Sequence, residues 1–198
     1  MSAGSLVLVR HGETEDNRAG RLLGRSDPPL TALGRVQARA VARVLAAEGP
    51  VAIVSSPLLR ARETADAIGD ACGVAPTVDE RLIEIDYGAW ERRPLAEVPR
   101  DAAALTSDPS VAFPDGESLV DVGTRVAELC EELLACDGLV VAVSHVSPVK
   151  GAVAWALGSG DALAWRMHLS LGSITRLGRR RAGPYLLSFN ETGHLRRS

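Results

Sequence analysis

Short apolar runs alternate along the chain with longer stretches in which apolar residues recur at helical spacing. Three runs, at residues 6–9, 51–54 and 139–143, contain no polar residue and each precedes a helical pattern. Strands of this kind are typical of parallel sheets that are covered on both faces. The pattern therefore predicts an α/β fold: a three-layer sandwich with a mostly parallel central sheet and helices on both faces.

Capping residues place the ends of the expected helices. Thr31 and Ser118 are N-cap residues ahead of apolar stripes at helical spacing, and Gly73 is a typical helix end. Ser56-Pro57 and Ser147-Pro148 each predict a helix start, with serine as the cap and proline at the first helical position. Helices are thus expected directly after the second and third apolar runs.

The remaining segments predict an irregular excursion and two more strands. Residues 88–113 are interrupted by prolines, which indicates mostly irregular structure. Strands near 173–177 and 185–189, joined by an Arg/Gly turn, would leave a sheet edge with which a second copy could pair, so a homodimer is one expectation. No repeat or linker divides the sequence, and a single domain over residues 1–198 is expected.

Composition excludes several classes of partner. The 198 residues carry a net charge of −3, which provides no broad basic surface for nucleic acid. No apolar stretch approaches the roughly 18 residues of a membrane span, so no membrane partner is expected. The three cysteines form no CxxC pair, and the N-terminal sequence lacks the apolar core of a signal peptide. These features predict a reduced, cytoplasmic protein.

Chemically active residues follow all three apolar runs. Arg10 and His11 come directly after the first run, Arg60 follows the second at the start of a helix, and His145 follows the third. Because ligands of open α/β sheets bind outside the carboxyl ends of the strands, these side chains are expected to meet at one sheet edge. The arginines could clamp a phosphoryl group, and two helix N-termini would add positive dipole ends. An imidazole could then attack phosphorus and form a covalent intermediate.

Such a reaction also needs an acid that protonates the leaving group. Glu84 is the candidate, because Leu82, Ile83 and Ile85 flank it in the sequence. An apolar setting of this kind favours the protonated carboxyl group. Asp86 is the nearest rival for the role.

Six sequence blocks carry a resemblance to a known family. In chain order they are LVRHGETEDN, DPPLTALGRVQA, SSPLLRARETA, RLIEIDYGAWE, PDGES and VAVSH. Together they resemble the histidine phosphatase superfamily, the phosphoglycerate mutase-like proteins, over nearly the whole chain. The resemblance implies the phosphoglycerate mutase-like fold and a metal-independent histidine acid-type phosphatase, which is a phosphoric monoester hydrolase.

The resemblance also implies a role for each matching position. His11 would be the nucleophile that becomes phosphorylated. Arg10, Arg60 and His145 would hold the phosphoryl oxygens and stabilise charge in the transition state. Glu84 would protonate the leaving oxygen and then act as the base for the attacking water.

Residues around the implied phosphate site define the expected pocket. Asn17 is implied as a further polar contact to the phosphate. Leu23 stands where many relatives carry a polar residue, so one contact to the phosphate is expected to be absent. Val146 stands where many carry a glycine, so its side chain is expected to narrow the path of the substrate to the site. Tyr87 and Trp90 follow the loop of the expected acid and are expected to line the substrate pocket.

The predicted function is a phosphomonoesterase that hydrolyses small phosphate esters through a phosphohistidine on His11. A phosphoglycerate mutase, which is an isomerase, is the first alternative. Only about 25 residues between Gly88 and Pro114 are available to close over the intermediate and exclude water, which favours hydrolysis. A non-catalytic module that binds a phosphate ligand is the second alternative, and the presence of His11, His145 and Glu84 ranks it last.

The expected partner is a small phosphorylated metabolite. Sugar phosphates, phosphoglycerate derivatives and α-ribazole phosphate remain open as substrates, and SHVSPVK resembles a branch that includes α-ribazole phosphatase-like proteins. The histidines and thiols have no metal-ligand spacing, so neither a metal nor an organic cofactor is expected.

Overall fold

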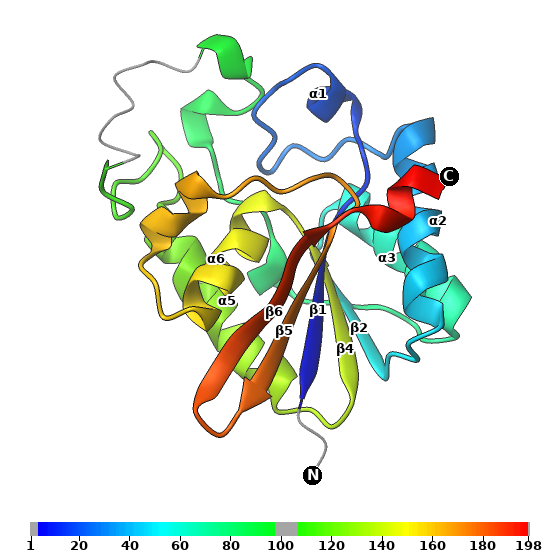
Figure 1. Cartoon of the computed structure of the whole chain (residues 1–198). Helices are drawn as coiled ribbons and strands as arrows, with labels where there is room; N and C mark the ends of the chain where they lie inside the picture. Colours follow the sequence, from blue (N-terminus) through cyan, green and yellow to red (C-terminus); the bar gives the residue numbers. More distant parts are fainter. Residues whose placement is uncertain (1–3, 98–106, 198) are drawn as a thin grey trace.

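The computed structural model describes residues 4–97 and 107–197 and is built around a six-stranded sheet (Figure 1). The strands are β1 (Ser5–Arg10), β2 (Ala52–Ser55), β3 (Thr77–Val78), β4 (Leu139–Ser144), β5 (Ile174–Arg180) and β6 (Gly183–Glu191). The α-helices are α1 (Glu15–Arg18), α2 (Ala32–Ala46), α3 (Leu59–Cys72), α5 (Leu119–Leu134) and α6 (Val146–Ala156).

The sheet is mixed, with strand order β3-β2-β4-β1-β5-β6. The pairs β1–β4, β2–β4 and β2–β3 are parallel, whereas β1–β5 and β5–β6 are antiparallel. The predicted α/β fold with a mostly parallel sheet is therefore confirmed. The sequence did not predict β3, because its two residues are too few to show a hydrophobic period.

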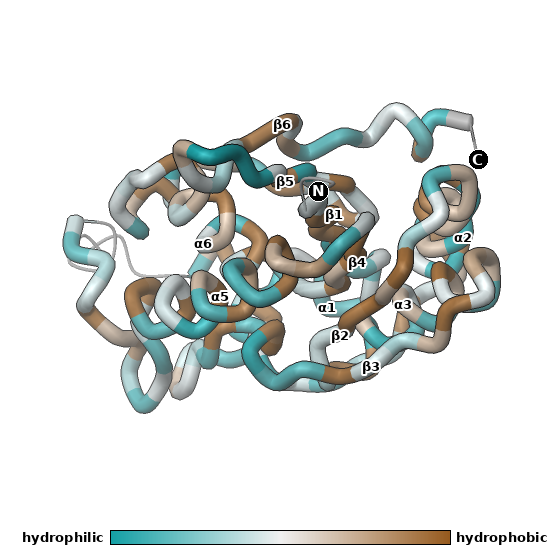
Figure 2. Tube along the Cα trace, turned by 90° about the horizontal axis from the view of Figure 1, so that it is seen from below, coloured by the Kyte–Doolittle hydropathy of each residue, from teal (hydrophilic) through white to brown (hydrophobic). Residues whose placement is uncertain are grey.

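Helices cover both faces of the sheet, as predicted. In the view along the strands, α5 and α6 lie on one side and α2 and α3 on the other, with apolar strand residues between them (Figure 2). Successive side chains of β1 point to opposite faces of the sheet. Leu6 and Leu8 belong to the core beneath α5 and α6, and Val7 and Val9 belong to the core beneath α2 and α3. Residues 6–9 of β1 are all apolar because neither face of the strand meets water there.

Three of the predicted helix ends are confirmed. The side chain of Thr31 accepts a hydrogen bond from Gly34 N–H at the start of α2. Ser118 and Asp121 form a reciprocal capping box at the start of α5. Gly73 ends α3 in the left-handed conformation, with φ of 70°, which glycine adopts without steric cost.

The two Ser-Pro pairs do not start helices as predicted. α3 begins at Leu59, three residues after Ser56. The Ser56 hydroxyl lies 2.7 Å from Nε2 of His145 and also accepts a hydrogen bond from Leu58 N–H, just before α3, at 3.4 Å. α6 begins at Val146, one residue before Ser147, and His145 takes the N-cap position.

Short 3₁₀ helices occupy part of the segment that was expected to be irregular. They span Gly88–Trp90 and Leu95–Glu97, while residues 98–106, which include Pro99, lie outside the described part of the chain. Within the described ranges, no helix has the length and apolar character needed to cross a membrane.

Candidate active site

The carboxyl ends of β1 and β4 bring two histidines together. These strands are parallel neighbours, and Arg10 pairs with Ser144 in their register, so the next residues, His11 and His145, lie side by side. Their ring centroids are 5.0 Å apart. In Figure 1 this is the upper edge of the sheet, beneath α1 and its loop. The predicted meeting of the two imidazoles at one sheet edge is therefore what the structure shows.

His11 is held in one tautomer. Its Nδ1 lies 2.7 Å from the carbonyl oxygen of Gly12, which can only accept a hydrogen bond, so the ring hydrogen belongs on Nδ1. Nε2 therefore carries a lone pair, and this nitrogen accepts a hydrogen bond from Nε of Arg60 at 3.2 Å. A buried, unprotonated Nε2 is what a nucleophilic imidazole needs.

Arg60 is anchored by the backbone of a neighbouring loop. Its Nη1 donates to the carbonyl of Ser26 and its Nη2 to the carbonyl of Gly24, each at 2.7 Å. Glu91 organises this loop, because its carboxylate accepts hydrogen bonds from the N–H groups of Gly24, Arg25 and Ser26. Gly24 has no room for a side chain, since a Cβ there would lie 2.6 Å from a Glu91 carboxylate oxygen.

His145 and Arg10 each present a buried polar atom without a protein partner. Nε2 of His145 lies 2.7 Å from Oγ of Ser56, whereas its Nδ1 has no hydrogen-bond partner in the described part of the chain. Nη1 of Arg10 donates to the carbonyl of Leu169 at 2.6 Å, and its Nε finds no partner among the same residues. Because buried polar groups are normally paired, these two atoms mark a place for an external polar group.

Burial and nearby guanidinium groups keep both imidazoles neutral. Burial lowers the pKa of His11 well below 6.5, and the charges of Arg60 and Arg10 lower it further. Burial, followed by the charge of Arg60, also lowers the pKa of His145 well below 6.5. Burial lowers the pKa of Arg10 to about 10, which leaves it a cation at neutral pH. The site therefore sets a neutral nucleophile among fixed positive charges.

Glu84 lies at the N-terminus of α6 and not in the apolar setting that its sequence neighbours suggested. Its Oε1 accepts hydrogen bonds from the N–H groups of Ile85, at 2.9 Å, and Ser147, at 3.0 Å. Its Oε2 accepts one from Val146 N–H at 3.0 Å. The reason is that amides at the first turn of α6 have no partner within the helix, and the carboxyl oxygens of Glu84 accept them. The Val146 amide, which lies at one of the two expected anion-binding helix ends, is thus used by Glu84.

The other expected anion-binding helix end also holds a carboxylate. Leu59 N–H, at the start of α3, donates to Asp27 Oδ1 at 2.6 Å. The amides identified at the two helix N-termini therefore serve side chains of this chain, which corrects the expectation that they face a phosphoryl group.

Asp86, the rival acid, points away from the site. Its Oδ1 accepts a hydrogen bond from Gly88 N–H at 2.8 Å, and its Oδ2 lies 3.6 Å from Nε of Arg25. It is not among the described residues that line the cavity at His11, whereas Glu84 is. Glu84 is therefore the carboxylate of this site.

A cavity of about 370 Å³ opens onto His11 and Glu84, large enough for a small metabolite. The expected pocket residues that line it are Asn17, Leu23, Tyr87 and Val146. Trp90 does not belong to the described lining; its ring packs edge-on against Phe113 with centroids 5.5 Å apart, in the core. Arg60 and His145 are fully buried and reach His11 from within the protein.

Three residues of the site escaped the sequence reasoning. Ser56 was assigned to a helix cap, and no local signal pointed to its contact with His145. Glu91 lies in a quoted block, but its loop contacts join residues 65 to 67 positions apart in the sequence and leave no period. Lys150 lines the cavity four residues after Val146, so its place on the same helix face was the available signal.

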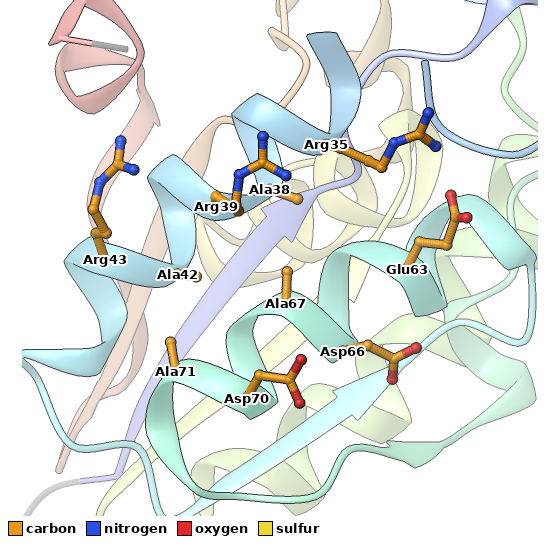
Figure 3. A pocket seen from close by; sticks show the side chains of 10 residues that line it. All are labelled: Arg35, Ala38, Arg39, Ala42, Arg43, Glu63, Asp66, Ala67, Asp70 and Ala71. Atoms are coloured by element: carbon orange, nitrogen blue, oxygen red, sulfur yellow. The ribbon is translucent and has the colours of Figure 1, made fainter. Parts of the chain in front are cut away.

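A larger groove elsewhere carries none of this chemistry. It has a volume of about 660 Å³ and lies between α2 and α3 (Figure 3). Its walls are charged, its floor is formed by alanines, and its lining contains neither a histidine nor a thiol. The charged residues are Arg35, Arg39 and Arg43 on α2 and Glu63, Asp66 and Asp70 on α3. The smaller cavity, which contains His11 and Glu84, is therefore the candidate active site.

Comparison with known proteins identifies relatives of this arrangement. The sequence profile of the histidine phosphatase superfamily (branch 1) matches residues 6–192. A bifunctional protein of Mycobacterium tuberculosis is 38% identical over 177 residues, which are 86% of this chain and 49% of that protein. The chain thus spans about half the length of the curated relatives matched at this level.

Two relatives that match over most of their length are phosphatases by name. Phosphoserine phosphatase 1 of Hydrogenobacter thermophilus is 34% identical over 197 residues, which are 96% of this chain and 93% of that protein. The structure of a mycobacterial glucosyl-3-phosphoglycerate phosphatase in complex with VO3 superposes with a TM-score of 0.88. It is 33% identical, and the match covers 96% of this chain and 100% of the other.

Proposed function

This chain belongs to branch 1 of the histidine phosphatase superfamily, and on that premise we propose that it is a phosphomonoesterase that hydrolyses small phosphate esters through a phosphohistidine on His11. The observation that carries the proposal is a pair of buried atoms beside the lone pair of His11, Nε of Arg10 and Nδ1 of His145, which have no partner among the described residues. Phosphoryl oxygens are acceptors that would satisfy both N–H groups.

The proposed reaction has two steps. In the first, Nε2 of His11 attacks phosphorus while the bond from phosphorus to the ester oxygen breaks. Glu84 gives its proton to that oxygen, so an alcohol departs. In the second, the Glu84 carboxylate takes a proton from water, the water oxygen attacks phosphorus, and the phosphorus–nitrogen bond breaks. Inorganic phosphate leaves, and His11 and protonated Glu84 are regenerated.

The hydrogen bonds of Glu84 assign its mobile proton to one oxygen. Two backbone N–H groups occupy the lone pairs of Oε1, whereas Oε2 accepts only the Val146 N–H in the described part of the chain. Oε2 therefore keeps one lone pair that can hold and release a proton. The three backbone hydrogen bonds fix the direction in which this proton is delivered.

Guanidinium groups would balance the charge of the phosphoryl group. Arg10 and Arg60 supply positive charge within a buried site, where such charge stabilises the transition state most. We therefore propose that hydrolysis does not depend on a metal ion. The neutral state of His11 is favoured down to mildly acidic pH, which suits a phosphatase of the acid type.

The names of the relatives support a substrate class. Phosphoserine and glucosyl-3-phosphoglycerate are both small phosphate esters, so a small phosphorylated metabolite is the proposed substrate. All three cysteines are free thiols, which is consistent with a proposed place in the reduced cytoplasm.

Phosphate release from a panel of small esters, measured with EDTA present, tests the proposal. Wild type is expected to release phosphate and His11→Ala is not. Acid-labile phosphate on the quenched protein, present in wild type and absent from His11→Ala, would report the phosphohistidine. Equal release by the two proteins would overturn the mechanism. An isomerised ester in place of free phosphate, with stimulation by a bisphosphoglycerate, would instead establish a mutase.

A further inference from the structure

One cation in the lining of the active-site cavity, Lys150, has no partner in the part of the chain that the structure describes. Lys150 lies on α6 four residues after Val146, so both side chains lie on the same helix face, and both line the cavity with Glu84. The Lys150 side chain is half-buried, and within residues 4–97 and 107–197 its ammonium group makes no hydrogen bond or ion pair. The cavity therefore contains an unsatisfied positive charge next to the catalytic carboxyl group.

The other basic side chains of the described lining already have contacts. Arg10 donates to a backbone carbonyl beside His11. Arg21, at the rim, lies 3.9 Å from a carboxylate oxygen of a buried aspartate. The exposed His168 has Nε2 at 3.4 Å from a serine hydroxyl. Among the described residues, Lys150 is thus the basic side chain of the lining that makes no protein contact, whereas Arg10 keeps one unpaired N–H at the His11 end of the cavity.

The Lys150 ammonium is partly buried and, in the described part of the chain, has no hydrogen-bonded anion to offset its charge. Burial lowers its pKa, and the charge of Glu84 only partly opposes that effect. Glu84 gives it no hydrogen bond, because the carboxylate accepts three backbone N–H groups instead. A half-buried charge without a partner is unfavourable, and an anionic group that enters with the substrate would offset that cost.

The position of Lys150 points to the alcohol portion of the ester. Lys150 also lines an adjoining hollow of about 160 Å³ that shares Tyr87 and Val146 with the cavity but includes neither His11 nor Arg10. Ile85 and Ser147, whose N–H groups donate to Glu84, also line this hollow, so it lies beside the carboxyl group that would protonate the leaving oxygen. The phosphoryl group would occupy the His11 end, so a group that reaches Lys150 belongs to the leaving alcohol.

We propose that Lys150 is a specificity-determining residue that binds a carboxylate on the alcohol portion of the substrate. The single ammonium charge matches a carboxylate monoanion, and the small hollow limits the size of the group. The inference rests on the proposed function and narrows its substrate class to phosphate monoesters of hydroxy acids.

A matched pair of ligands tests this proposal without turnover. 3-Phosphoglycerate and glycerol 3-phosphate share a three-carbon skeleton and differ in a carboxylate against a hydroxymethyl group. In the His11→Ala background, calorimetry is expected to show tighter binding of 3-phosphoglycerate by about 10- to 100-fold, the range for a hydrogen bond between charged groups. Adding Lys150→Met should reduce this ratio to near one, and Lys150→Arg should preserve part of it.

Arg21→Met is the matched control, because it removes a rim cation that already faces an aspartate. It is expected to change the ratio by about twofold or less. A ratio near one in the His11→Ala parent, or a ratio that survives Lys150→Met, would overturn the proposal. Equal weakening of both ligands would show that Lys150 acts through Glu84 or the fold. If binding follows expectation while wild type hydrolyses no ester, the proposed function fails and the carboxylate site stands.

Discussion

Nε of Arg60 lies 3.2 Å from Nε2 of His11, so the guanidinium that would hold the phosphoryl group also touches the lone pair of the nucleophile. The other two nitrogens of Arg60 are each fixed 2.7 Å from a loop carbonyl. One planar group therefore aligns the nucleophile, the loop and the anion site at once. A lysine ammonium lacks the fork that makes these three contacts together.

Arg60→Lys is expected to lower kcat about 10²- to 10³-fold, the usual cost of removing one preorganised donor. The measurement is the steady-state rate on an ester that wild type hydrolyses, with a thermal melt to confirm folding. Arg62→Lys, on the exposed side of the same helix, is the control and should keep the rate. A folded Arg60→Lys enzyme with more than a tenth of the wild-type rate would contradict the expectation.

Glu84→Gln should lower the rate of ester hydrolysis by an amount that depends on the leaving group. Loss of the general acid is expected to reduce the rate on an alkyl phosphate about 10²- to 10⁴-fold. The rate on 4-nitrophenyl phosphate should fall less in the phosphorylation step, because its leaving group departs without a proton. Asp86→Asn, which alters the rival carboxyl outside the cavity, should show no such dependence. Pre-steady-state release of nitrophenol measures the step, and equal losses on both esters would count against Glu84 as the acid.

Ser56→Ala is expected to lower kcat about tenfold through His145. The Ser56 hydroxyl lies 2.7 Å from Nε2 of His145, and donation to that nitrogen places the ring hydrogen on Nδ1, where it can face a phosphoryl oxygen. Loss of a hydroxyl that pairs a buried group costs about 1–3 kcal/mol. Ser55→Ala is the control, because it removes a buried neighbouring hydroxyl that donates to the backbone carbonyl of Ser56 and, among the described residues, contacts no imidazole. A pH–rate profile unchanged by Ser56→Ala would argue that the hydroxyl does not position the imidazole.

Glu91→Gln should weaken phosphate binding although Glu91 does not touch the cavity. The carboxylate holds three successive N–H groups of residues 24–26, and the carbonyls of that loop anchor Arg60. We expect the inhibition constant of inorganic phosphate to rise about tenfold, in line with the loss of one charge-assisted hydrogen bond. Glu128→Gln, an exposed change on α5, should leave it as in wild type. The same constant in Glu91→Gln and wild type would mean that the loop holds its shape without this charge.

The free energy of unfolding is expected to fall as the pH drops below about 6.5. The unfolded chain binds protons at His11 and His145 near pH 6.5, whereas in the folded protein both pKa values lie well below that value. Protons therefore favour the unfolded state, by up to about 1.4 kcal/mol per pH unit for each imidazole, until the folded pKa is reached. Urea unfolding at pH 7.5, 6.5 and 5.5 measures the slope.

Variants separate the contributions to that slope. His145→Asn should reduce it by roughly half, whereas His168→Asn, at an exposed position, should leave it unchanged. A wild-type stability that does not vary between pH 6.5 and 5.5 would show that the imidazoles are not held neutral by burial.

The sequence alone determined the layered fold and the meeting of the two histidines. Unbroken apolar strands require helices on both faces, and β1 shows why, since Leu8 and Val9 enter opposite cores. Parallel strands end at one edge, so residues directly after β1 and β4 had to become neighbours. These are consequences of hydrophobic period and strand direction, which are local properties of a sequence.

Only the tertiary structure decided how the polar groups around the histidines are paired. Val146 N–H meets Glu84 across 62 residues, and the Ser56 hydroxyl meets His145 across 89. Each of these donors had a plausible local use, as an anion-binding amide or as a helix cap. Buried polar groups must be paired wherever the fold offers a partner, and that requirement acts through space, so it leaves no period along the chain.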